Sequence, residues 1–290
     1  MTKGIVPPVL SLEGRRALVT GGGTGIGKAC ATALAAAGAS VTICGPDLAV
    51  LEAACGDLAR LDLHDVKAIT ADITDEAQVA TAVDAAAMDS GLDIAVANAG
   101  VAFPGSLLHI GADHWMGPIG VNVIGTAHTI KHAARAMMEG GGSIITISSI
   151  ASTRPAAFMS TYSVSKAAVD ELTRVAAAEL GRFGIRVNGI RPGWMRTETV
   201  EATTDEHNLA MIRRDTPLAA ETPLGQLGDP DHVARAVVYL AADYSSWITG
   251  QLLGVCGGSS LPPPSGDFSH IARLLFAEDM ARDFDTSEEE

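Results

Sequence analysis

Short apolar runs rich in valine and isoleucine alternate along this chain with longer stretches in which apolar residues return every three or four positions. The short runs have the length and composition of buried strands, and the longer stretches have the period of amphipathic helices. The pattern predicts seven strands, over residues 16–20, 41–44, 67–70, 93–97, 143–148, 185–190 and 251–255.

Polar residues that accept hydrogen bonds mark where several predicted helices begin. Asp47 is placed to cap a helix over about 47–60, Thr74 to cap the next helix, and Asp229 to cap a helix with a proline at its first position. Other helices are expected over 26–38, over about 113–138 and from about 160 onward.

Strands that alternate with helices in this way form a parallel sheet with helices on both faces. We therefore predict an α/β fold with a doubly wound, parallel, seven-stranded sheet, in a single domain that spans residues 1–290. Its core is expected over about 10–258, followed by a C-terminal extension over about 259–290. A polar, irregular segment over about 196–228 is expected to act as a lid.

The turn between the first strand and its helix is rich in glycine. Residues 21–27 read Gly-Gly-Gly-Thr-Gly-Ile-Gly. Glycines let the backbone turn tightly and approach a pyrophosphate, while the N-terminus of the next helix offers unpaired N–H groups and a positive dipole end. Many loops are rich in glycine, so it is the position between a strand and a helix that predicts phosphate binding.

A serine, a tyrosine and a lysine follow the fifth strand. Ser149 stands at the strand end, and Tyr162 and Lys166 lie near the start of the next helix. Residues four apart share a helix face, so we expect the Lys166 ammonium to lower the Tyr162 pKa, which is ordinarily about 10. The helix N-terminus acts in the same direction. With Ser149 holding a substrate oxygen, this group predicts proton transfer at a hydroxyl or carbonyl.

A tyrosine and a lysine four positions apart also occur by chance on a helix, so this pair alone does not establish a catalytic site. Evidence from other parts of the chain is needed. Gly21–Gly27, Asp72, Asn98, Ser149 and Pro192 all follow the ends of predicted strands. The carboxyl ends of parallel strands meet at one edge of a sheet, where ligands bind. This convergence favours one functional site over a chance pair.

Composition and charge argue against several classes of partner. The 290 residues are 47% hydrophobic, enough for a sizeable core, and carry a net charge of −14. An acidic chain repels phosphates, so we expect neither nucleic acid nor membrane as a partner. No apolar run has transmembrane length, and residues 1–14 lack the pattern of a signal peptide. The four cysteines form no C-x-x-C pair, which indicates reduced thiols in a cytoplasmic protein.

Two histidines, His128 and His132, stand four positions apart, a spacing that can bind zinc. No third ligand is indicated, so we interpret them as polar residues on a solvated helix face and expect no metal site. Arg154 is placed either to bind a substrate carboxylate or to lie in solvent.

Several motifs in order make residues 10–258 resemble the short-chain dehydrogenase/reductase family, which implies a Rossmann-type fold. Asn122, Ser149, Tyr162 and Lys166 match the family's catalytic tetrad, with the tyrosine at the usual spacing from the serine. The resemblance implies that Tyr162 exchanges the substrate proton and that Ser149 binds the substrate oxygen. It also implies that Lys166 lowers the tyrosine pKa and holds the nicotinamide ribose, while Asn122 supports a water relay. A hydride passes between the substrate carbon and the nicotinamide.

The same resemblance implies a set of cofactor-binding residues. Residues 20–27 match the cofactor loop, Asp72 the aspartate at the adenine ring, and residues 192–197 the segment at the nicotinamide amide. The full set is Gly21, Thr24, Gly25, Ile26, Gly27, Gly45, Pro46, Asp72, Ile73, Asn98, Ala99, Gly100, Tyr162, Lys166, Pro192, Gly193, Met195 and Thr197. Ala97 departs from the family's usual asparagine, and Cys256 stands where an aspartate is common.

The residues expected at the adenosine ribose favour NAD over NADP. The family's usual aspartate falls on Gly45, its usual arginine on Pro46, and Thr24 stands where a basic residue often marks NADP use. No cation is placed to pair with a ribose phosphate, and Asp47 lies close by.

We therefore predict an oxidoreductase that transfers a hydride between a nicotinamide cofactor and an alcohol or ketone. The alternatives are an NADPH-dependent 3-oxoacyl or ketone reductase, and a dinucleotide-sensing protein without turnover, against which the complete tetrad argues. An apolar substrate pocket is expected from Phe103, Phe158, Met159, Trp194, Met195 and Met211.

The resemblance further implies a homotetramer, with a dimer as the alternative. Its subunits are expected to meet through the helix after Tyr162 and through the last strand and helix. Alanines at 167, 168 and 176–178 predict a flat helix face that packs closely on a partner.

Overall fold

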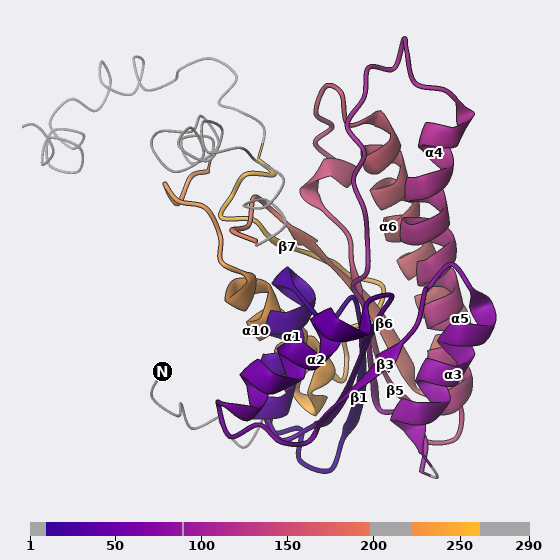
Figure 1. Ribbon diagram of the computed structural model, residues 1–290, viewed down its shortest axis with the longest axis vertical. Helices are drawn as coiled ribbons and strands as arrows, with labels where there is room; N and C mark the ends of the chain where they lie inside the picture. The colour runs from indigo at the N-terminus through magenta and orange to yellow at the C-terminus, as the bar shows by residue number, and fades with distance from the viewer. Residues whose placement is uncertain (1–9, 89, 198–221, 262–290) are drawn as a thin grey trace, which may run out of the picture. The chain divides into compact units, whose positions relative to one another are not determined.

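A computed structural model describes residues 10–88, 90–197 and 222–261 (Figure 1). Contacts divide the chain into two units, residues 1–260 and 261–290, and every described helix and strand belongs to the first unit. Most of the predicted lid, residues 198–221, and nearly all of the predicted C-terminal extension, residues 262–290, lie outside the described residues.

Seven parallel strands form one sheet in the order β3-β2-β1-β4-β5-β6-β7, which confirms the predicted fold class. The chain starts in the middle of the sheet, winds outward to β3, and then crosses back to continue from β4 to β7 on the other side. The strands are β1 (Arg16–Thr20), β2 (Ser40–Gly45), β3 (Val66–Thr70), β4 (Ile94–Ala97), β5 (Gly142–Ile147), β6 (Ile185–Pro192) and β7 (Leu252–Val255).

Helices cover both faces of the sheet (Figure 1). One face carries α1 (Gly25–Ala36), α2 (Leu48–Ala59) and α10 (Pro230–Ala241), and the other carries α3 (Glu76–Ala87), α4 (Ala112–Pro118), α5 (Thr126–Met137) and α6 (Ser160–Leu180). Each face has its own apolar core, because successive side chains of a strand point to opposite sides. Leu18 and Val19 of β1 show this, since they belong to different cores.

The helix caps show where local sequence decides a boundary. Asp47 accepts hydrogen bonds from the N–H groups of Ala49 (2.9 Å) and Val50 (3.2 Å), as predicted for the start of α2. Asp229 and His232 form a capping box at the start of α10, with Pro230 at the first helical position.

The predicted cap of α3 at Thr74 is wrong. Asp75 caps the helix instead, because its carboxylate accepts from Ala77 N at 2.9 Å. The Thr74 hydroxyl is engaged elsewhere, since it donates to Asp72 Oδ1 at 2.8 Å.

The prediction of one long helix over 113–138 is also wrong in detail. Helix α4 ends at Pro118, a wider π-helical segment, η2, spans Ile119–Gly125, and α5 follows from Thr126. Proline lacks the N–H group that a regular helix interior needs, which favours such a break. At Gly125 the backbone comes so close to Ile73 that a Cβ would lie 2.5 Å from the isoleucine Cδ1.

Helix α6 begins at Ser160, as predicted, and lies against β6. Two alanines of its predicted flat face, Ala176 and Ala177, are buried in the core, so these two do not form a surface for a partner as predicted. The helical period of 3.6 residues turns them toward the sheet, whereas Ala167 and Ala178 are exposed. No helix among the described residues is both long and apolar enough to cross a membrane.

Candidate active site

The residues singled out from the sequence gather at the carboxyl ends of the strands. The glycine-rich loop follows β1, Asp72 follows β3, Asn98 follows β4 and Ser149 follows β5, while Pro192 ends β6. Because every strand pair is parallel, these residues share one edge of the sheet.

The glycine-rich loop is closed too tightly for side chains. A Cβ on Gly27 would collide with the carbonyl oxygen of Gly21, and a Cβ on Gly22 would lie 2.6 Å from Ile43 Cβ. The loop therefore presents bare backbone at the N-terminus of α1. Such a cradle fits the pyrophosphate of a dinucleotide.

Asn98 ties this loop to the end of β4. Its Nδ2 donates to the carbonyl oxygens of Thr20 (2.9 Å) and Gly21 (3.2 Å). The Thr20 hydroxyl in turn accepts from the backbone N–H groups of Asn98 (3.0 Å) and Ala99 (3.2 Å). This exchange of hydrogen bonds is a function of Thr20 that the sequence pattern did not indicate.

The N-terminus of α1 lacks a side-chain cap. Thr24 is the N-cap residue, yet its side chain makes no capping hydrogen bond in the described structure. The first N–H groups of a helix have no partner within the helix, so they are available to an anion held by the glycine loop.

The expected adenosine end of the site lies past β2 and β3. Among the described residues, a Cβ on the buried Gly45 would meet only Leu51 Cδ2 within 4 Å, at 3.6 Å, so a small side chain there would not clash with them. Pro46 follows, and the neighbouring Asp47 is occupied in capping α2. Asp72 Oδ1 accepts from both the N–H and the hydroxyl of Thr74, so this carboxylate also shapes its own turn.

The start of α6 brings together the three residues predicted for proton transfer. Lys166 Nζ lies 5.7 Å from the centroid of the Tyr162 ring and donates to the carbonyl oxygen of Ile147 at 2.8 Å. The side chain of Ser149 interacts with that of Tyr162, and the Ser149 hydroxyl accepts from Ala151 N at 3.1 Å.

Burial dominates the electrostatics of this group. It lowers the pKa of Lys166 from 10.5 to about 8, against the opposing effect of the negative charge on Asp170. It also raises the pKa of Tyr162 above 10, while the hydrogen bond from Ser149 acts in the opposite direction. The expectation that Lys166 lowers the Tyr162 pKa is therefore wrong for the chain by itself. The cause is loss of solvation, which exceeds the opposing effect of the hydrogen bond from Ser149.

Asn122 reaches the site from the π-helical segment η2. Its side chain is fully buried, accepts from Val101 N at 2.8 Å, and donates to Val101 O (2.9 Å) and Ser165 Oγ (2.8 Å). It thus joins the loop after β4 to helix α6. π-Helical turns often occur at functional sites because they displace a side chain from the regular helix surface.

Gly100 separates two of the predicted catalytic residues. A Cβ at this position would lie 3.1 Å from Asn122 Oδ1 and 3.2 Å from Lys166 Nζ. The short Asn98–Gly100 segment therefore holds the glycine loop at one end and borders Asn122 and Lys166 at the other.

The segment after β6 also closes on the glycine loop. Gly193 donates to Val255 O at 3.0 Å, and a Cβ on Gly193 would meet Cys256 at 2.8 Å. A Cβ on Gly25 would lie 3.4 Å from Thr197 Cγ2, so the two predicted cofactor segments are neighbours.

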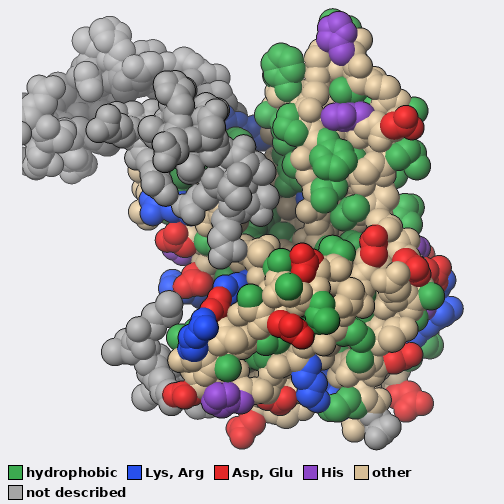
Figure 2. Space-filling view, viewed as in Figure 1, with side chains coloured by type: hydrophobic (Ala, Val, Ile, Leu, Met, Phe, Trp, Pro, Cys, Tyr) green, Lys and Arg blue, Asp and Glu red, His purple; other side chains and the backbone are tan. Residues whose placement is uncertain are grey.

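The predicted apolar pocket is assembled only in part. Met195 lines a cavity of about 290 Å³ next to Leu224 and Cys256, whereas Phe103, Phe158 and Trp194 do not line it. Met211 lies outside the described residues. Figure 2 shows hydrophobic side chains gathered instead over the upper part of the layer that α4 and α6 form.

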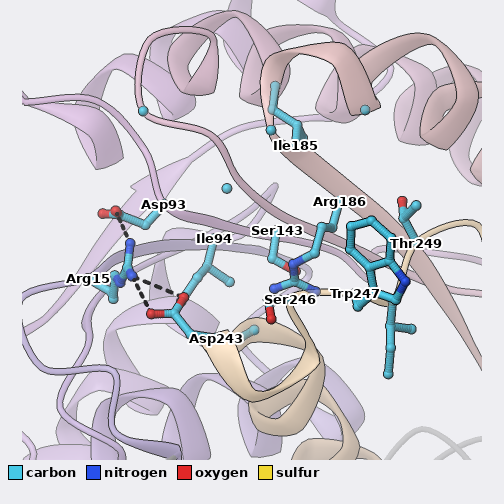
Figure 3. A pocket seen from close by; sticks show the side chains of 16 residues that line it. Arg15, Asp93, Ile94, Ser143, Ile185, Arg186, Asp243, Ser246, Trp247 and Thr249 are labelled. Atoms are coloured by element: carbon cyan, nitrogen blue, oxygen red, sulfur yellow. Dashed lines mark hydrogen bonds and ion pairs between the residues drawn. The ribbon is translucent and has the colours of Figure 1, made fainter.

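A larger cavity, of about 510 Å³, lies at the opposite edge of the sheet (Figure 3). Its lining includes Arg15, Asp93, Ser143, Arg186 and Trp247, which stand at or before the amino ends of the strands. Figure 3 shows Arg15 directed toward Asp93 and Asp243, with which it forms ion pairs. None of the predicted site residues lines this cavity.

The remaining polar candidates have structural partners. Glu76 pairs with Lys131 and His132 and lies 3.8 Å from His128 Nε2. These partners lower the Glu76 pKa to about 2. Arg154 donates to Ser259 O, so it is not a purely solvated side chain. Within the described ranges, no three His, Cys, Asp or Glu residues are grouped to hold a metal ion.

Comparison with known proteins connects this site to one enzyme family. The family model described as Enoyl-(Acyl carrier protein) reductase matches residues 21–260. The chain is 40% identical over 250 residues to cis-4-hydroxycyclohexanecarboxylate dehydrogenase of Sinomonas cyclohexanicum, covering 84% of this chain and 96% of that protein. It is 36% identical to galactitol 2-dehydrogenase (L-tagatose-forming) of Cereibacter sphaeroides, covering 86% and 96%. A short-chain type dehydrogenase/reductase structure from Mycobacterium ulcerans has a TM-score of 0.80 and 38% identity, covering 94% and 98%.

Proposed function

Because this chain belongs to the short-chain dehydrogenase/reductase family and is an NAD(P)-dependent oxidoreductase that acts on CH–OH groups, we propose that it interconverts an apolar secondary alcohol and its ketone with NAD. The observation that carries the proposal is the contact of Ser149, Tyr162 and Lys166 at the sheet edge that also holds the glycine cradle.

The proposed site holds the cofactor along the strand ends. The Gly21–Gly27 loop binds the pyrophosphate, Asp72 contacts the adenine, Lys166 holds the nicotinamide ribose, and residues 192–197 contact the nicotinamide amide. Bound NAD supplies the hydride acceptor for the oxidation and, once reduced, the donor for the reverse reaction.

The proton moves through the residues at the start of α6. Ser149 donates a hydrogen bond to the substrate oxygen and so orients the reacting carbon. Tyr162 accepts the hydroxyl proton during oxidation, and the Lys166 ammonium stabilises the negative charge on the tyrosine oxygen. Asn122 supports a water relay that returns the proton to solvent.

Three exposed aromatic side chains that the sequence predicts for the substrate pocket support an apolar substrate. Phe103, Phe158 and Trp194 are 42%, 66% and 44% exposed. Phe158 has a φ of +65°, which is strained for a bulky residue, and such strain concentrates at functional sites. Its carbonyl oxygen is held by Gly105 N at 2.8 Å. Since the relative from Sinomonas acts on a hydroxylated cyclohexane ring, we propose a cyclic secondary alcohol as the substrate class.

The test is a panel of alcohols mixed with the purified protein and NAD, followed by the absorbance of reduced nicotinamide. Substituted cyclohexanols should turn over faster than open-chain polyols. Reduction of 3-oxoacyl thioesters with NADPH at a higher kcat/KM would favour the reductase alternative. Cofactor binding without any turnover on the panel would favour a sensing protein.

The cofactor preference rests on the end of β2. Gly45 and Pro46 offer no cation to a ribose phosphate, and Asp47 adds a negative charge close by. We expect kcat/KM to be higher with NAD than with NADP on the same alcohol. P46R should shift the ratio toward NADP, because a guanidinium there pairs with the phosphate. A wild-type ratio that favours NADP contradicts the assignment.

We also propose a cytoplasmic homotetramer. Apolar side chains of α4, η2 and α6 are exposed in the single chain, namely Met116 (63%), Ile124 (46%), Val164 (49%) and Val175 (46%). The cysteines in the structure are free thiols, which fits a reducing compartment. Sedimentation at micromolar concentration should give about four times the chain mass of 29.8 kDa, and a 29.8 kDa species alone would rule the assembly out.

A further inference from the structure

Helix α6 carries a second charged residue one turn beyond Lys166. Asp170 is 3% exposed and Lys166 is 4% exposed, so both charges lie in the protein interior. Residues four apart lie on the same helix face. Burying a charge is costly unless other groups compensate for the lost water.

Only one of the two carboxylate oxygens of Asp170 accepts hydrogen bonds from the described residues. Arg191 of β6 donates to Asp170 Oδ2 twice, from Nε at 3.0 Å and from Nη2 at 2.8 Å. Asp170 Oδ1 is buried and accepts no hydrogen bond from the residues that the structure describes. An arginine that served only to clamp α6 to β6 would be expected to use both oxygens. Asp170 Oδ1 therefore carries part of the carboxylate charge without a hydrogen-bond donor among the described residues.

Among the described residues, Asp170 is the charged group whose effect on Lys166 is resolved. Ile147 of β5 offers a carbonyl oxygen, the Tyr162 ring is uncharged, and the neutral Asn122 side chain of η2 lies across Gly100. Arg191 faces Asp170 from β6. Burial lowers the pKa of Lys166 to about 8, and the Asp170 charge works against this lowering.

We propose that Asp170 is a positioning residue for proton transfer: its buried carboxylate, held by Arg191 through one oxygen, keeps Lys166 in the ammonium form. The inference rests on the proposed function, in which that ammonium stabilises the Tyr162 oxygen and holds the ribose. Asp170 touches neither substrate nor cofactor and acts through Lys166.

The test reads the charge of Lys166 directly, without cofactor or substrate. The chain has five lysines, so a protein labelled with ¹³C at lysine Cε gives few signals, and the spectrum of K166M identifies the one from Lys166. D170N should lower the pH at which this signal titrates by about one unit, because a negative charge near a buried ammonium is lost. D170E keeps the charge and should return the titration toward that of the wild type.

R191M is the matched control, because it breaks the same ion pair but leaves the Asp170 charge in place. Lys166 should then titrate at or above its wild-type pH, opposite to D170N. If Asp170 is only a clamp between α6 and β6, D170N and R191M will lose thermal stability alike while the Lys166 titration stays in place. That result overturns the proposal. If D170N does not fold, R191M alone tests the proposal. A Lys166 titration in R191M that lies below the wild-type pH contradicts the inference.

The outcome is separable from that of the proposed function. The titration is read on the apo protein, so it stands even if turnover is absent from the alcohol panel. In the active enzyme, the pH at which kcat/KM falls on the alkaline side should move downward in D170N by the same amount as the Lys166 titration.

Discussion

At the scale of the residue, Tyr162 is a group whose environment favours its protonated form. Burial raises its pKa, and the hydrogen bond from Ser149 only partly opposes the rise. A protonated phenol donates its proton to a ketone readily, but it must first lose that proton before it can accept one from an alcohol, so oxidation needs a stabilised phenolate. The positive charge of Lys166 lies 5.7 Å from the ring centroid and is placed to supply that stabilisation.

Replacing Tyr162 with phenylalanine should lower turnover by about two to four orders of magnitude, the usual contribution of a general acid or base. The dissociation constant for NAD should change little, because the glycine cradle is untouched. Tyr244→Phe is the control, since Tyr244 is 67% exposed and lies outside the site. Steady-state kinetics and calorimetric NAD titration measure the two effects. Retained turnover in Y162F would refute the assignment of the proton-transfer residue.

At the scale of the element, the turn between β1 and α1 works only because its backbone can approach other backbone. Gly27 lies against Gly21 and within reach of Asn98, where a Cβ would be 2.5 Å from Nδ2. The same Asn98 nitrogen holds the loop through Thr20 and Gly21. A side chain at Gly27 therefore disturbs the cradle and its hydrogen bonds together.

Gly27→Ala should weaken NAD binding by at least about tenfold, which corresponds to about 1.4 kcal/mol. Gly56→Ala is the matched control in another helix, because a Cβ there would meet no atom of the described residues within 4 Å. Gly56 lies inside α2, so alanine should raise stability by about 0.5–1 kcal/mol and leave NAD binding unchanged. Calorimetry and denaturant unfolding measure the pair, and equal NAD affinity in G27A and wild type would argue against the cradle.

At the scale of the whole molecule, buried ionisable groups make stability depend on pH. Burial raises the pKa of Cys30 and Cys44 from 9.0 to about 12. The unfolded thiols lose protons that the folded ones retain, so their contribution is complete below pH 9 and is lost as the pH rises toward 12. Lys166 has the opposite effect on stability. Its pKa is lowered from 10.5 in the unfolded chain to about 8 in the folded one, so between pH 8 and 10.5 the unfolded chain binds a proton that the folded chain does not.

Between pH 9 and 10.5 the two buried thiols outweigh the single lysine, so the free energy of unfolding should fall as the pH rises. Urea unfolding of the apo protein across this range measures the slope. The variant with both C30A and C44A should no longer lose stability there, although the cavities lower its stability at every pH. A slope that is unchanged in this variant would show that other groups control the alkaline limit.

The strands, their alternation with helices, the glycine turn, and the caps at Asp47 and Asp229 were predictable from the order of residues. These features depend on periodicity and on neighbours within a few positions, which the linear order of residues contains. The same holds for Tyr162 and Lys166, because one helix turn brings residues four apart together. The roles proposed for the site residues are predictions that kinetics must test.

Features that depend on contacts between distant segments could be identified in the folded protein alone. The π-helical break around Asn122, the exchange of hydrogen bonds between Thr20 and Asn98, and the burial of Ala176 and Ala177 against the sheet are of this kind. The pKa of Tyr162 is another, because desolvation depends on everything packed around a group and not on its spacing from Lys166. The pairing of Asp170 with Arg191 likewise joins two elements whose contact no local pattern encodes.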